Sequence, residues 1–133
     1  MRSLLTMALL ATTLLASSLA TSLQAAEPQI GHMVFFTLKD NTPETRKTLI
    51  DACNKYLSKH EGTVYYSAGA RGEEFAREVN DQTFDVALHL VFKDKAAHDL
   101  YATHPRHLKF IEECKANWKT VRVFDSLVTE EAK

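Results

Sequence analysis

The stretch HMVFFTLK, residues 32–39, decides the fold of this chain. Side chains in a β-strand alternate between the two faces of the sheet, so the faces can be read separately. Both faces of this strand are apolar, and a strand of that kind needs cover on both sides of its sheet. Val34, Phe36 and Leu38 share one face, while Met33 and Phe35 share the other.

The flanking sequence predicts three more strands, over residues 63–69, 84–92 and 121–128. Each is rich in β-branched and aromatic residues. Between the second and third predicted strands lies a charged and polar connection, residues 71–83, whose charges we expect to face solvent. The alternative is a loop that covers a pocket, which its length would allow.

Three helical stretches complete the pattern. The first begins after Thr42, a good N-cap followed by Pro43, and we expect it to end at Gly62. Two further helices are predicted over residues 95–101 and 105–118. The order βαββ(αα)β is a ferredoxin-like α+β arrangement, an antiparallel sheet with helices on one face.

These helices are too few to cover both faces of the predicted sheet, although the strand over residues 84–92 is also apolar on both faces. An exposed patch of Val, Phe and Leu forgoes about 25 cal/mol for each Å² left unburied. We therefore expect a second copy to pack sheet against sheet. The chain would then be a homodimer that closes an α+β barrel.

The stretch YATHPRH, residues 101–107, sets a phenol and two imidazoles beside a helix break at Pro105. His107 shares one helical stripe with apolar residues farther along, so it should face the interior. His104, held extended before the proline, should face solvent. Tyr101 and His107 could then exchange protons with a ligand; the alternative is a packing tyrosine and solvated histidines. His98 is expected to be exposed, and His60 only to interact with a helix end.

The first 26 residues predict a signal peptide, and residues 27–133 a single domain. Arg2 precedes an uncharged apolar run from Leu4 to Ala20, and small residues follow at Ala25 and Ala26. The chain should therefore be exported, to a periplasm or outside the cell, with no stable membrane insertion after cleavage. A retained membrane anchor is the alternative, because the apolar run could almost span a bilayer.

The charge of the chain excludes a general attraction to polyanions. Without the predicted signal peptide it has 15 basic and 17 acidic residues, a net charge of −2. Nucleic acid is therefore not an expected partner.

Four motifs together give the chain a resemblance to the stress-responsive A/B barrel (Dabb) family of the dimeric α+β barrel superfamily. They are HMVFFTLK at 32–39, FDVAL at 84–88, YATHPRH at 101–107 with Phe110, and VRVFD at 121–125. The resemblance implies a homodimeric barrel. It does not imply one function, because such families include stress proteins, scaffolds and a few enzymes.

A plant cyclase of this family adds an implication about residues. By that resemblance, its catalytic tyrosine and histidine fall on Tyr101 and His107, and a histidine at the start of its first strand falls on His32. The resemblance thus implies His107 as a base beside a carbonyl, with Tyr101 as its hydrogen-bonding partner. The implied ligand-binding residues are His32, Tyr101, His107 and Phe110.

Three functions follow as hypotheses. The first is a stress-response or binding module for a small apolar or aromatic molecule. The second is an enzyme without a cofactor, resembling a cyclase, lyase or monooxygenase, that uses His107 and Tyr101 for proton transfer. The third is an oligomerisation module with no ligand.

We expect neither a metal site nor a cofactor. His104, His107 and His32 could approach one another, but no cysteine or carboxylate cluster completes a ligand set around them. Cys53 and Cys114 should lie on neighbouring helices, where either a disulfide or two buried thiols would be compatible with export.

Overall fold

The computed structural model describes residues 25–129 of the 133-residue chain. The predicted signal peptide, residues 1–26, lies almost wholly outside the described residues. The elements are, in chain order, β1 (Gln29–Leu38), α1 (Pro43–Tyr56), β2 (Thr63–Ala70), β3 (Val86–Phe92), α2 (Lys95–Thr103), α3 (Pro105–Cys114), the 3₁₀ helix η1 (Lys115–Asn117) and β4 (Trp118–Val128).

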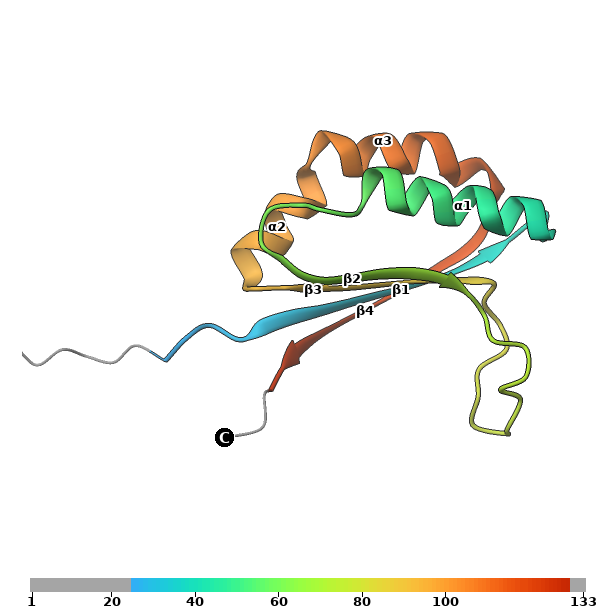
Figure 1. Ribbon diagram of the computed structural model, residues 1–133, viewed down its shortest axis with the longest axis horizontal. Coiled ribbons are helices and arrows are strands. Elements are labelled where there is room, and N and C mark those ends of the chain that lie inside the picture. Colours follow the sequence, from blue (N-terminus) through green and yellow to red (C-terminus); the bar gives the residue numbers. More distant parts are fainter. Residues whose placement is uncertain (1–24, 130–133) are drawn as a thin grey trace, which may run out of the picture.

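The sheet has the ferredoxin-like topology that the sequence predicts. Its strand order is β2-β3-β1-β4, and every neighbouring pair is antiparallel. Figure 1 shows α1, α2 and α3 on one side of this sheet and no helix on the other. The α+β class with helices on one face is confirmed. None of the helices in the described part is long and apolar enough to cross a membrane.

The first helix begins where predicted and ends earlier than predicted. Thr42 and Thr45 form a capping box, in which each side chain accepts from the other residue's backbone N–H. The helix ends at Tyr56, so the predicted end at Gly62 is wrong. Gly62 instead forms a turn with φ 79°, where an added Cβ would lie 2.4 Å from Ala97 Cβ.

The last helix also ends earlier than predicted, at Cys114 instead of residue 118. Trp118 keeps the helical spacing in sequence but begins β4. The physical reason is a set of long-range hydrogen bonds, because Lys39 N donates to Asn117 O at 2.8 Å and Asp40 N to Asn117 Oδ1 at 2.9 Å. These bonds pull the chain out of the helix and into the sheet.

A buried carboxylate fixes the start of β3. Asp85 lies just before this strand, which begins at Val86 and not at Phe84 as predicted. Its oxygens accept 2.8 Å hydrogen bonds from Leu38 N and from the Asn41 side chain. The carboxylate therefore fastens the end of β1 to the start of β3, and its burial is compensated by these bonds.

The two faces of the sheet differ sharply. The face under the helices contains the core, built around Phe36, Leu88, Leu90 and Phe92. The other, which we call the open face, carries Met33, Phe35, Tyr65, Ala87, His89, Val91 and Phe124 at facing register positions. Met33, Tyr65 and Phe124 are 40%, 53% and 54% exposed. The open face is thus the uncovered apolar surface that the strand pattern predicts.

Candidate functional site

A cavity of about 210 Å³ lies between the helices and the sheet, and its wall includes all four predicted ligand-binding residues. His32 comes from β1, Tyr101 from α2, and His107 and Phe110 from α3. The rest of the wall is apolar: Val34, Phe36, Leu57, Leu88, Ile111, Trp118, Val121 and Val123. An apolar cavity with a few convergent polar groups is the usual form of a small-molecule site.

Tyr101 lines this cavity, and its hydroxyl is buried. It ends the second turn of α2 and is only 2% exposed. Its ring centroid lies 4.6 Å from that of His107 and 5.7 Å from that of His32. The hydroxyl has no hydrogen-bond partner among residues 25–129. Burial raises its pKa, so the phenol stays protonated and can donate to a ligand.

His107 stands in the first turn of α3, as predicted, with its ring half-buried. Its Nδ1 lies 3.0 Å from the carbonyl oxygen of Ala102. Because a carbonyl can only accept, Nδ1 carries the proton and Nε2 keeps its lone pair. Burial lowers the pKa of the ring, and the Ala102 carbonyl opposes this in part. His107 is therefore a neutral acceptor, which a general base must be.

His32 is held by a partner from the neighbouring edge strand. His32 and Asp125 are register partners on β1 and β4, and His32 Nδ1 lies 2.5 Å from Asp125 Oδ1. A carboxylate accepts, so Nδ1 of His32 donates, and in the neutral form of the ring Nε2 is the acceptor. His32 is 8% exposed, so this side chain is a fixed part of the cavity wall.

His104 does not enter the cavity, and the expectation that it faces solvent is only partly right. Its backbone is extended, with φ −65° and ψ 138°, as the following proline requires. The ring is half-buried, and its Nδ1 accepts from Arg106 N at 3.1 Å. His104 therefore caps α3, a role that suits its position before Pro105.

His60 is a neighbour of the site that sequence reasoning missed. It is 7% exposed, its Nε2 donates to Tyr56 O at 2.8 Å, and its ring lies 4.9 Å from that of Tyr101. A second cavity of about 290 Å³ lies on this side of Tyr101, which lines both. No spacing rule could have found His60, because the turn after α1 brings it to α2.

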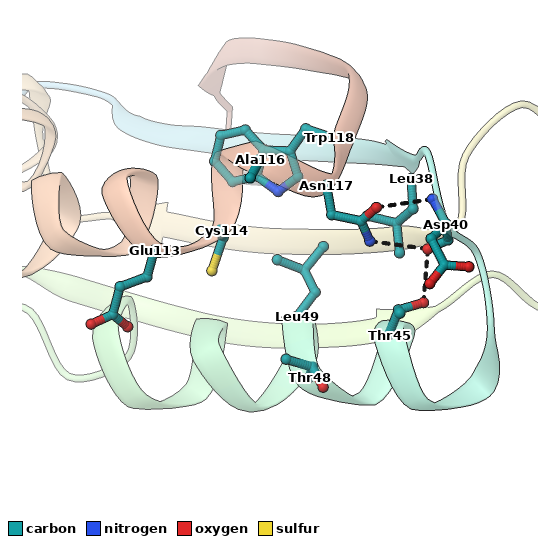
Figure 2. A pocket seen from close by; sticks show the side chains of 10 residues that line it. All are labelled: Leu38, Asp40, Thr45, Thr48, Leu49, Glu113, Cys114, Ala116, Asn117 and Trp118. Atoms are coloured by element: carbon teal, nitrogen blue, oxygen red, sulfur yellow. Dashed lines mark hydrogen bonds between the residues drawn. The ribbon is translucent and has the colours of Figure 1, made fainter.

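Another cavity, of about 310 Å³, lies elsewhere, between the start of α1 and the end of α3. Figure 2 shows its polar rim tied together, with the Asn117 side chain and the Thr45 hydroxyl both donating to the Asp40 carbonyl. No histidine or tyrosine lines it. Trp118 is the one wall residue that it shares with the 210 Å³ cavity. We take the smaller cavity as the candidate site because the titratable groups converge there.

Thiol titration should find two reactive thiols per chain in the denatured, unreduced protein. Cys53 and Cys114 lie on α1 and α3, which pack together as predicted, and both are free. Burial raises the pKa of Cys53 to about 12, so the native protein should react slowly there. Absence of thiols after denaturation would show that the pair is bridged.

Acid should destabilise the fold from about pH 6.5 downward. Burial lowers the pKa of both His107 and His60 from the usual 6.5. Below pH 6.5 these two histidines take up protons in the unfolded chain more readily than in the folded protein, so the free energy of unfolding decreases as the pH is lowered. Above pH 6.5 both histidines are neutral in the folded and in the unfolded state, and they add no pH dependence. Urea unfolding from about pH 8 to about pH 5 measures this. His107→Gln should flatten the slope, and an unchanged slope would contradict the assignment.

Comparison with known proteins identifies relatives by family and by fold. The model of the Stress responsive A/B Barrel Domain (Dabb) matches residues 30–128. A Dabb family protein with a ferredoxin-like fold from Mesorhizobium loti is 21% identical, with 78% of this chain and 100% of that chain covered and a TM-score of 0.64. No curated protein matches this chain.

Two further solved structures share the fold. A dimeric ferredoxin-like protein of unknown function from Thermobifida fusca is 17% identical over 77% of this chain and 92% of its own, with a TM-score of 0.63. The hydroxynitrile lyase from Passiflora edulis is 16% identical over 80% of this chain and 98% of its own, also with a TM-score of 0.63. At these identities the similarity shows the fold alone.

Proposed function

Because this chain belongs to the stress responsive A/B barrel (Dabb) family, we propose that it is an exported homodimer that binds a small aromatic molecule in the 210 Å³ cavity. Export rests on the uncharged apolar run from Leu4 to Ala20, which follows Arg2. N-terminal sequencing of the protein recovered outside the cytoplasm tests it, with Ala26 or Glu27 expected as the first residue.

The unpaired hydroxyl of Tyr101 carries the binding proposal. A buried hydroxyl without a partner costs about 1–3 kcal/mol, which a ligand oxygen would recover on binding. Nε2 of His107 offers an acceptor beside it. The rest of the wall is apolar, and a cavity of about 150 Å³ is known to hold benzene, so 210 Å³ suits one substituted ring. The best fit is an aromatic compound with a hydroxyl or carbonyl group.

A second candidate function, proton transfer, is favoured by the pairing of His107 with Tyr101. A neutral imidazole can take a proton from carbon or oxygen beside a carbonyl, while the phenol hydrogen-bonds the carbonyl oxygen as negative charge develops. Their ring centroids are 4.6 Å apart, and both residues line the same cavity. That a hydroxynitrile lyase shares this fold is compatible with such chemistry, although it does not assign it.

The dimer is supported by the open face. Its apolar side chains come from all four strands, and none of the helices in residues 25–129 lies over them (Figure 1). The related solved structures include proteins described as dimeric. Sheet-to-sheet packing of two copies would bury this face and close the barrel.

NMR titration with phenol and with 4-hydroxybenzaldehyde tests the ligand proposal. We expect the His107 and His32 ring resonances to shift, and His107→Ala to weaken binding at least about tenfold, the value of one lost hydrogen bond. His104→Asn is the matched control, because it keeps a cap for α3 and lies outside the cavity. Equal binding by both variants would exclude the site. Turnover of an aldehyde substrate, lost only in His107→Ala, would favour the enzyme over the binder.

A further inference from the structure

Three potential metal ligands meet beside the cavity, and only one of them lines it. They are His32 on β1, His98 on α2 and Asp125 on β4, and one ligand atom from each lies within 4.8 Å of the others. Sequence reasoning considered His104 and His107 with His32, and expected no metal. It did not consider His98, which is half-buried and not exposed as expected. We propose that His32, His98 and Asp125 bind a divalent transition-metal ion of the zinc type.

The hydrogen bonding of His98 is the main argument. Its Nδ1 lies 3.2 Å from Asp99 Oδ1, and the carboxylate must accept, so Nδ1 carries the proton. Nε2 therefore presents a lone pair, and it lies 3.8 Å from Asp125 Oδ1. Two acceptors facing each other repel unless a proton on Nε2 or a cation between them removes the repulsion, and a metal ion would use both lone pairs. A histidine whose other nitrogen donates to a carboxylate is also the arrangement that orients zinc ligands.

The distances suit a tetrahedral ion after a small adjustment. Zinc bonds of about 2.0–2.1 Å place neighbouring ligand atoms about 3.3 Å apart. The separation of 3.8 Å between His98 Nε2 and Asp125 Oδ1 is close to that value. The 2.5 Å between His32 Nδ1 and Asp125 Oδ1 must widen by about 1 Å. The Asp125 side chain is 49% exposed, which leaves it room to rotate.

The surroundings also fit such an ion. His32 is buried and its ring lies 5.2 Å from that of His98, with Phe92 against both, at 6.2 and 5.7 Å. This apolar backing holds the two imidazoles in place. Two imidazoles and one carboxylate are a ligand set that zinc favours, and a fourth position would remain for water on the exposed side of Asp125.

Metal binding would also change what His32 offers to the cavity. In the structure Nδ1 of His32 donates to Asp125, so its Nε2 is an acceptor. With a metal on Nδ1, the neutral ring must carry its proton on Nε2 and becomes a donor. This effect of the metal on the cavity depends on the proposed function of the cavity as a ligand site. The proposal that the three residues bind a metal does not depend on it.

Isothermal titration of the chelator-treated mature protein with ZnCl₂, in the absence of any aromatic compound, tests the site. We expect one Zn²⁺ per chain. His98→Ala and Asp125→Asn should each weaken binding at least about tenfold, and Asp99→Asn about 10–100-fold, as for other partners that orient a ligand. His104→Asn, a histidine variant outside the trio, should bind like the wild type.

Circular dichroism of each variant checks that it is folded, and Asp99→Asn tests the site at a more exposed residue, whose side chain is 53% exposed. No zinc uptake by the wild type at about 100 μM, or equal uptake by His98→Ala and His104→Asn, would overturn the proposal. Absence of zinc binding would not contradict the proposal that the cavity binds an aromatic molecule, because the titration contains no aromatic compound. Absence of aromatic binding would likewise not contradict the proposed metal site.

Discussion

Replacing Phe35 with aspartate is expected to leave the protein monomeric. Phe35 lies at the centre of the open face, with its ring 5.0 Å from that of Phe84 and 5.8 Å from that of Phe124. In a sheet-to-sheet dimer the new carboxylate would be buried against apolar side chains without a partner, at a cost of several kcal/mol. The dissociation constant should therefore rise at least about 10³-fold.

Sedimentation velocity at micromolar concentration measures this effect. Leu108→Asp is the matched control, because Leu108 is 54% exposed but lies on α3, on the helical side of the molecule. That variant should stay dimeric. Phe124→Asp is a second variant on the open face at an already exposed position, and it should dissociate as Phe35→Asp does. A wild-type protein that sediments as a stable monomer would remove the barrel model.

The second large effect concerns Tyr101, where two substitutions should change stability in opposite directions. Tyr101→Ala removes a buried ring that packs against Phe92 and His60, with centroids 4.9 Å away in each case. The lost burial and the resulting cavity should cost about 3–5 kcal/mol of unfolding free energy. Urea or thermal unfolding measures this cost.

Tyr101→Phe should be neutral or slightly stabilising, because the hydroxyl it removes is buried and unpaired in the described part of the chain. Removing this unpaired hydroxyl could recover as much as its burial costs, about 1–3 kcal/mol. The same variant should lose most of its affinity for a phenolic ligand. A hydroxyl that lowers the stability of the fold but contributes to ligand binding has a functional and not a structural role at this position. If Tyr101→Phe destabilised the fold and left binding unchanged, the hydroxyl would be structural and the proposed site wrong.

The sequence alone determined the arrangement of secondary structure in the fold. Stretches that are apolar on both faces, 32–39 and 84–92, predicted the strands of the central pair, and Thr42 with Pro43 located the start of α1. These signals are local, because period, capping and proline geometry depend on a few neighbouring residues. The same locality placed His107 in the first turn of α3, facing inward beside Tyr101.

Only the tertiary structure decided where elements end and which distant polar groups meet. Trp118 continued a helical stripe in sequence, but the hydrogen bonds of Asn117 with residues 39 and 40 turned it into a strand. His98 and Asp125 joined His32, and His60 joined Tyr101, across sequence separations that no periodicity encodes. The hydrophobic pattern of a sequence predicts on which face of a helix or strand a residue lies. The register of β1 with β4 and the packing of α2 on the sheet decide which polar groups share that face, because they depend on contacts over the whole chain.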